Sequence, residues 1–234
     1  IYTYSRIQED MATKFDNILA QRSKKLNVKS QEFNAIKTLV DLLLDSGITI
    51  ESFENFFTSY TIEQIGKEFD LLKIDKNNLV LNIELKSENI GEDAIKKQLR
   101  KNRYYLNHIA PDVRLYTFVD SSKKLYRHTE SGLKCVEIKD LKDTMQSFEE
   151  SLSQNIESLF KANNFLISPL NTPEKFMSGD YFLTNQQQEI KEKVMNLILT
   201  NEKESIIGIT GKAGTGKTLL LYDIVKEVSE NGTQ

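Results

Sequence analysis

The stretch EFDLLKIDKNNLVLNIELK, residues 68–86, decides the fold that this chain is expected to adopt. Two runs with the composition of strands, residues 68–74 and 79–86, flank a polar tripeptide at residues 76–78. The asparagines of this tripeptide tolerate the left-handed backbone that tight turns often need. The stretch therefore predicts an antiparallel β-hairpin closed by a short polar loop.

The loop also determines which residues of the hairpin face each other. A loop at residues 76–78 puts Asp70 directly opposite Glu84, with the two Cβ atoms about 5 Å apart. Because side chains alternate along a strand, Lys86 shares their face. A slip by one residue would turn these charges toward the core, so we expect the register to be well specified. The opposite, apolar face is expected to pack on that core and consists of Phe69, Leu71, Leu79, Leu81, Ile83 and Leu85.

Two carboxylates held this close repel each other unless a positive charge lies between them. Carboxylate oxygens suit Mg²⁺ or Mn²⁺, and Mg²⁺ typically keeps several waters. One such water can be activated to attack a phosphodiester. Lys86 can hold that water or stabilise the developing charge. The alternative reading is a surface hairpin that carries a Glu-Lys pair and no chemistry.

Asp70 together with Glu84-Leu85-Lys86 resembles the motifs of the PD-(D/E)xK nuclease superfamily, over roughly residues 31–138. Phe69 stands where the family name has proline. The resemblance implies an α/β fold of the restriction-endonuclease type, a mixed sheet flanked by helices. It also implies a metal held by Asp70, Glu84 and the backbone carbonyl of Leu85, with Lys86 as a catalytic residue.

Apolar periodicity predicts the elements around the hairpin. Residues 50–65 are expected to be helical or mixed and to close over the sheet. We expect Cys135 to be a buried small side chain and His128 to lie on a sheet edge rather than in a catalytic site. Helices are predicted at residues 1–28, 30–46, 92–109 and 141–160, and strands at residues 113–118, 124–128 and 133–138.

The predicted helix at residues 92–109 carries a basic row. Lys96, Arg100 and Arg103 share one side of it and could contact phosphates at several points along a nucleic acid. An ordinary solvated helix face explains the same residues equally well.

The resemblance suggests two further candidate residues for the active site. RecB-type nucleases have a glutamine on the corresponding helix, followed one turn later by a tyrosine. Gln98 is the matching glutamine and is expected to be catalytic, but the spacing then lands on Asn102 and leaves the tyrosine unassigned. Glu32, early in the preceding helix, is the candidate for an additional acidic residue, with a solvated helix start as the alternative.

Residues 161–182 contain two prolines and a glycine among Asn and Ser, and they form the best boundary in the chain. The apolar residues of this segment predict a packed strap rather than a flexible linker. We therefore expect a nuclease domain with N-terminal helices at residues 1–160, the strap at residues 161–182, and a second, incomplete domain at residues 183–234.

The second domain is predicted from GKAGTGKT at residues 211–218, which matches the P-loop pattern GxxxxGKT. An apolar strand, SIIGIT, is expected at residues 205–210 and a helix directly after the loop. In that context the loop amides and the helix dipole favour phosphate. Lys217 should reach the β and γ phosphates, and Thr218 should ligate Mg²⁺. The residues expected to bind ATP are Gly211, Gly214, Thr215, Gly216, Lys217 and Thr218.

Residues 183–218 are similar to superfamily 1 helicases, especially the Schlafen-type DNA/RNA helicase group. Within this segment LTNQQ looks like the Q motif. Gln187 is the matching position, expected to read adenine, with Gln186 and Gln188 as the alternatives. A nuclease followed by such a domain resembles bacterial nuclease–helicase proteins, many of which are linked to defence against phage and other foreign DNA. Because the sequence ends just after the predicted P-loop helix, without a Walker B acid or a second motor domain, we expect a fragment that cannot couple ATP hydrolysis to movement.

The composition of the chain excludes several kinds of binding site and favours one cellular location. The net charge of −3 provides no global basic field, so any nucleic-acid surface must be local. A single cysteine excludes an intramolecular disulfide and a cysteine-based zinc site. The sequence shows no membrane-length apolar run and no signal-peptide core, which favours the cytoplasm.

The sequence thus predicts a Mg²⁺- or Mn²⁺-dependent deoxyribonuclease joined to an ATP-driven helicase or translocase. The main alternative is a catalytically inactive nuclease fold that binds DNA and delivers it to a P-loop motor. A third reading is a P-loop NTPase whose N-terminal part only mediates assembly. RNA as the substrate, the strandedness, the mode of cleavage and a homo-oligomeric state stay open.

Overall fold

The computed structural model describes residues 1–7, 11, 30–62, 67–77, 79–149, 156–160, 167–179, 181–200 and 206–230. The chain forms two compact units. Unit 1 comprises Ile1–Ile62 and Glu68–Phe160, and unit 2 comprises Glu63–Lys67 and Lys161–Gln234.

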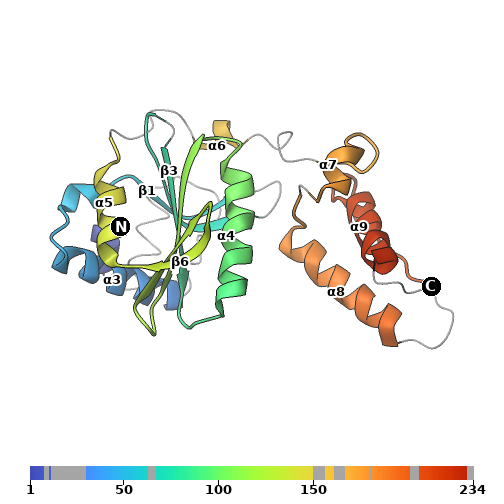
Figure 1. Ribbon diagram of the computed structural model, residues 1–234, viewed down its shortest axis with the longest axis horizontal. Coiled ribbons are helices and arrows are strands. Elements are labelled where there is room, and N and C mark those ends of the chain that lie inside the picture. The colour runs from blue at the N-terminus through green and yellow to red at the C-terminus, as the bar shows by residue number, and fades with distance from the viewer. Residues whose placement is uncertain are drawn as a thin grey trace. The chain divides into compact units, whose positions relative to one another are not determined.

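A six-stranded mixed sheet with the order β1-β2-β3-β4-β5-β6 organises the described part of unit 1 (Figure 1). β3 and β4 are parallel, whereas the pairs β2–β3, β4–β5 and β5–β6 are antiparallel. A parallel pair needs a crossover, and α4 supplies it between β3 and β4. The strands are β1 Phe56–Ile62, β2 Lys67–Ile74, β3 Leu79–Lys86, β4 Asp112–Val119, β5 Lys124–Thr129 and β6 Gly132–Val136.

The predicted hairpin is confirmed as β2 and β3. Leu71 pairs with Ile83, and Ile74 pairs with Val80. This is the register that a loop at residues 76–78 predicts. At the base of the loop, Oδ1 of Asp75 accepts the backbone N–H groups of Asn77 and Leu79, both at 2.9 Å, which fixes the turn.

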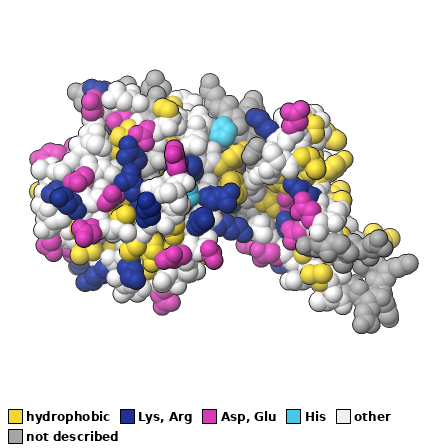
Figure 2. All heavy atoms as spheres, in the orientation of Figure 1, with side chains coloured by type: hydrophobic (Ala, Val, Ile, Leu, Met, Phe, Trp, Pro, Cys, Tyr) yellow, Lys and Arg dark blue, Asp and Glu magenta, His cyan; other side chains and the backbone are white. Residues whose placement is uncertain are grey.

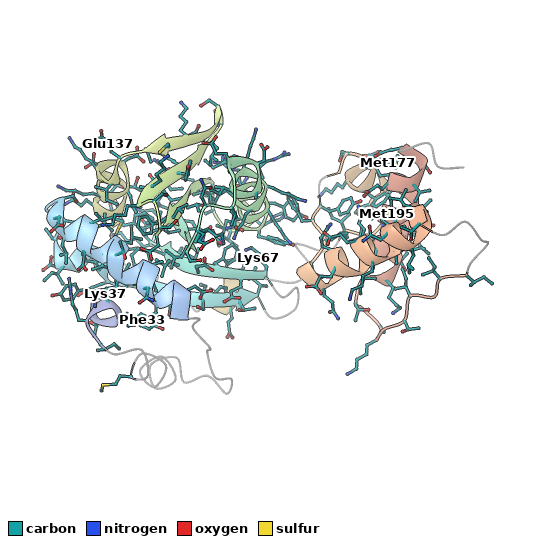
Figure 3. The ribbon with its side chains drawn as sticks, turned by 90° about the horizontal axis from the view of Figure 1, so that it is seen from below. Phe33, Lys37, Lys67, Glu137, Met177 and Met195 are labelled. Atoms are coloured by element: carbon teal, nitrogen blue, oxygen red, sulfur yellow. The ribbon has the colours of Figure 1, made fainter. Side chains whose placement is uncertain are left out.

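Helices cover both faces of the sheet (Figure 1). On one side lie α3 (Ser30–Asp45) and α5 (Ile138–Gln146), and on the other lies α4 (Glu92–Leu106). The apolar stripe of α3 packs on β3 and β4 in a single core (Figure 3 labels Phe33 on this helix). Leu39, Leu43 and Ile83 are completely buried there. Truncating such a residue to alanine typically costs about 2–5 kcal/mol.

Three expected elements of unit 1 are wrong. α1 covers only Tyr2–Arg6 and ends where Ile7 turns extended, at φ −98° and ψ 165°; of residues 8–29 the structure describes only Met11. Of residues 50–65, expected to be helical or mixed and to close over the sheet, the described part is mixed but does not cover the sheet. η1 (Ile50–Phe53) precedes β1, which is itself the edge strand, and the aromatic and threonine side chains of β1 favour a strand. The helix expected at residues 141–160 is not continuous, because α5 ends at Gln146 and α6 spans only Ile156–Leu159.

Two expected side-chain environments are also wrong. Cys135 is exposed rather than buried, because β6 is the last strand of the sheet. His128 lies on β5, which pairs with both β4 and β6 and is therefore not an edge strand.

Unit 2 is built around two helices, α8 (Asn185–Thr200) and α9 (Lys217–Glu230), with the short α7 (Pro173–Met177) before them. Val194 and Met195 of α8 pack with Leu220 and Ile224 of α9 (Figure 3 labels Met195). The strand expected at residues 205–210 is wrong for the described positions 206–210, which have no strand conformation. A strand needs a hydrogen-bonded partner, and here Ile206 is fully exposed.

None of the helices in the described residues is both long and apolar enough to cross a membrane.

Candidate functional site

Glu84 is the most deeply buried charged side chain of the candidate site, with 1% of its surface exposed beneath α4. Its Oε1 accepts a hydrogen bond from Nδ2 of Asn102 at 2.7 Å and lies 3.4 Å from Nδ2 of Asn82. Its Oε2 accepts a hydrogen bond from the Gln98 amide and lies 3.9 Å from Nζ of Lys86. A carboxylate removed from water is costly unless it is hydrogen-bonded, and here three amides satisfy it.

Asp70 is the second carboxylate. Continuing the β2–β3 register by one residue puts it opposite Glu84, and its Oδ2 accepts the backbone N–H of Leu85 at 2.7 Å. Burial and the charge of Glu84 together raise the pKa of Asp70 to about 8, although the Leu85 N–H and Lys86 act in the opposite direction. Two carboxylates so close together either share a proton or need a cation between them.

Lys86 ends β3 on the same face as Glu84. Its side chain is 21% exposed, so it lies at the margin of the site rather than inside it. The 3.9 Å separation from Glu84 is too long for a hydrogen bond. The ammonium is therefore close enough to act on a group bound beside Glu84 without being locked to it.

Gln98 and Asn102 lie one turn apart on α4 and point at the same carboxylate. The structure thus brings Gln98 into contact with Glu84, and it puts a second amide where the spacing of RecB-type nucleases has a tyrosine. Tyr105, the neighbouring aromatic residue of α4, is buried, and its desolvation raises its pKa to about 12.

Sequence reasoning missed the polar layer around Glu84. Asn82 and Thr117, on the sheet, and Asn102, on α4, are completely buried where α4 covers the sheet. Thr117 pairs with Glu84 in the β3–β4 register, and within the described chain no group is in hydrogen-bonding reach of its hydroxyl. Alternation identifies Asn82 as a member of this face, but nothing local in the sequence shows that Asn102 or Thr117 meets Glu84.

The donor chemistry of the site fits a hard divalent cation. Two adjacent carboxylates, Glu84 buried and Asp70 half-buried, attract positive charge, and carboxylate oxygens are the ligands that Mg²⁺ and Mn²⁺ prefer. Within the described residues no three His, Cys, Asp or Glu side chains gather into a group that could hold a metal. The chain would therefore supply Asp70, Glu84 and the Leu85 carbonyl, and water would complete the coordination, as is usual for Mg²⁺.

Glu32 acts on the carboxylate pair, whereas the basic row of α4 lies near His128 of β5. Glu32, in the first turn of α3, is among the charges that raise the pKa of Asp70, so it lies on the Asp70 side.

In the basic row of α4, Lys96 and Arg100 are exposed, and Arg103 donates from Nη2 to the carbonyl oxygen of His128 at 3.1 Å. These three cations, after burial itself, lower the pKa of the His128 imidazole. Figure 2 shows basic and acidic side chains mixed over the face in view.

The glycine-rich loop of unit 2, residues 211–218, precedes α9 directly. Gly214 and Gly216 have φ of 78° and 74°, a conformation that other residues adopt only with strain. Nζ of Lys217 donates to the carbonyl oxygens of Gly211 and Lys212 at 2.9 and 2.8 Å. The lysine thus folds back over the loop from the first residue of the helix. Thr218, the second residue of α9, is exposed.

Gln187 contacts this loop from the first turn of α8. Its Nε2 donates to the carbonyl oxygen of Thr215 at 3.0 Å, and its Oε1 accepts the backbone N–H of Thr184 at 2.9 Å. A Cβ atom at Gly216 would clash with the same amide nitrogen. Of the glutamines considered from the sequence, Gln187 is therefore the one held against the glycine-rich loop.

Comparison of the chain with protein-family models gives no match. Searches of curated proteins and of solved structures likewise find nothing similar.

Proposed function

We propose that unit 1 is a metal-dependent nuclease that cleaves DNA phosphodiester bonds. The observation that carries this proposal is the facing pair of Asp70 and Glu84, with Lys86 beside it, in a mixed sheet flanked by helices. A bound Mg²⁺ or Mn²⁺ would activate water and offset charge on the phosphate. The resemblance of the motifs favours DNA and a role in defence against foreign DNA.

The residues of the chain have separate roles in this proposal. Asp70 and Glu84 present oxygens to the cation from adjacent strands. Lys86, at the margin of the site, orients the attacking water or stabilises negative charge that develops on the phosphate. Gln98 fixes the Glu84 carboxylate and borders the reacting groups.

The test is cleavage of labelled single- and double-stranded DNA with Mg²⁺, Mn²⁺ or EDTA. Glu84→Gln and Lys86→Ala should reduce metal-dependent cleavage at least about 100-fold, the lower end of the range for loss of one catalytic group. Glu88→Gln and Lys97→Ala are matched controls, because both side chains are exposed. Equal cleavage by Glu84→Gln and wild type would refute the assignment.

The competing function is a catalytically inactive nuclease fold that holds DNA for a motor. It is favoured by the same amides that satisfy Glu84, because they stabilise the carboxylate without a cation. Tight DNA binding without cleavage under every metal condition would support this function, and Lys96→Ala and Arg100→Ala should then weaken binding and reduce its salt dependence.

For unit 2 we propose binding of ATP by the glycine-rich loop, as part of a helicase or translocase. Two positive-φ glycines, Lys217 at the start of α9 and Gln187 against the loop support this proposal. Binding of a fluorescent ATP analogue should be lost in Lys217→Ala and retained in Lys212→Ala, whose side chain is exposed.

A further inference from the structure

Asn102 is the hub of the polar layer beneath α4. Its Nδ2 donates both to Oδ1 of Asn82 and to Oε1 of Glu84, each at 2.7 Å. Asn82 in turn donates to the carbonyl oxygen of Leu71 on β2 at 3.1 Å. One side chain of α4 thus connects Glu84 on β3 to the strand that carries Asp70.

The two oxygens of Glu84 are consequently not equivalent. Oε1 faces the buried amides of Asn82 and Asn102. Oε2 faces Gln98 and Lys86, toward the partly exposed margin of the site. A carboxylate held through one oxygen cannot rotate freely, so the other oxygen keeps a fixed direction.

The side-chain amide of Asn102 uses its donor and not its acceptor. Oδ1 of Asn102 is buried and lacks a hydrogen-bond partner among the described residues. A buried acceptor without a partner is unfavourable, and an apolar side chain of similar size would avoid it. What an asparagine provides here, and an apolar side chain would not, is therefore the two hydrogen bonds donated by its Nδ2.

We propose that Asn102 is a positioning residue that fixes Oε1 of Glu84, so that Oε2 is the oxygen presented to the divalent cation. The inference rests on the proposed function of unit 1. In this proposal Asn102 does not touch the metal but orients Glu84, which does. Loss of such an orienting hydrogen bond typically weakens metal binding 10- to 100-fold.

The experiment measures Mn²⁺ binding to the whole chain without nucleotide, from the free Mn²⁺ signal in electron paramagnetic resonance. Asn102→Leu removes both donated hydrogen bonds at nearly constant size. Asn102→Ser replaces the amide by a smaller hydroxyl side chain. It is the variant to measure if Asn102→Leu does not fold. Asn107→Leu, at an exposed position just after α4, is the matched control, and Asp70→Asn identifies the site.

We expect the dissociation constant for Mn²⁺ to rise at least tenfold in the Asn102 variants, as in Asp70→Asn, and to stay unchanged in Asn107→Leu. A purely structural role would lower the melting temperature without changing Mn²⁺ affinity, and that result would overturn the inference while leaving the proposed function in place. If wild type itself binds no Mn²⁺ at this site, the metal-dependent function fails, and the inference fails with it.

Discussion

The backbone N–H of Leu85 donates a hydrogen bond to Oδ2 of Asp70 across 2.7 Å. Because Leu85 directly follows Glu84, the strand that carries one carboxylate also anchors the other. This contact stabilises the charged form of Asp70, yet burial and the charge of Glu84 outweigh it. The pair is therefore held together in a state that favours either a proton or a cation.

Asp70 should make the metal-free protein less stable as the pH rises. Its pKa is raised from 3.8 to about 8, so between these values the folded state keeps a proton that the unfolded state has released. The free energy of unfolding then falls with increasing pH across this window. Asp70→Asn should remove that fall and melt a few degrees above wild type at about pH 8.

Thermal melts in EDTA between about pH 5 and pH 8 measure this effect. Asp143→Asn, at an exposed position of α5, is the matched control and should follow the wild-type profile. Parallel profiles for Asp70→Asn and wild type would contradict the prediction.

Addition of Mn²⁺ should offset the loss of stability that the metal-free protein shows at high pH. A ligand that binds only the folded state at 100 times its dissociation constant stabilises it by about 2.7 kcal/mol. For a chain of this size that corresponds to a rise of roughly 5–10 °C in the melting temperature. Glu84→Gln should lose most of this rise, whereas the exposed control Glu88→Gln should keep it. The same rise in both variants would place the ion elsewhere.

The hairpin was predictable because its signals are local. A short polar loop and the alternation after Leu79 determine both the strands and the register, and the β2–β3 pairing confirms them. Alternation also identifies Glu84 as lying on the face opposite the apolar core. It does not reveal that α4 covers that face, because burial depends on a helix that follows in the chain.

The missed features depend on partners distant in the sequence. Asn102 and Thr117 meet Glu84 only through the crossover that puts β4 next to β3 under α4. The aromatic run at residues 56–62 has strand propensity, but its place at the sheet edge is set by pairing. Conversely, the apolar composition of residues 206–210 suggests a strand, and without a paired neighbour the backbone does not form one.

Tyr116 should contribute to stability through its hydroxyl. The side chain is completely buried, and the hydroxyl donates to Oδ1 of Asp140 at 2.6 Å and lies 2.8 Å from Oγ1 of Thr144. Tyr116→Phe removes these bonds and leaves the Thr144 hydroxyl without this partner, at a cost of about 1–3 kcal/mol. Asp140 keeps its ion pair with Arg127 at 2.8 Å, which limits the loss.

Urea unfolding measures this difference. In a double-mutant cycle with Thr144→Val, the two changes should be less than additive, because they remove a shared hydrogen bond. Strict additivity would show that the two hydroxyls do not interact.

Gly216 should be intolerant of any side chain. Its φ of 74° is strained for other residues, and a Cβ atom there would clash with the Gln187 amide that bonds to Thr215. Gly216→Ala should therefore displace Gln187, distort the loop ahead of Lys217 and weaken binding of a fluorescent ATP analogue at least tenfold. Gly208→Ala is the matched control, because an added Cβ meets nothing within 4 Å. It should bind like wild type. Wild-type affinity in Gly216→Ala would mean that neither the left-handed backbone nor the Gln187 contact matters for the nucleotide.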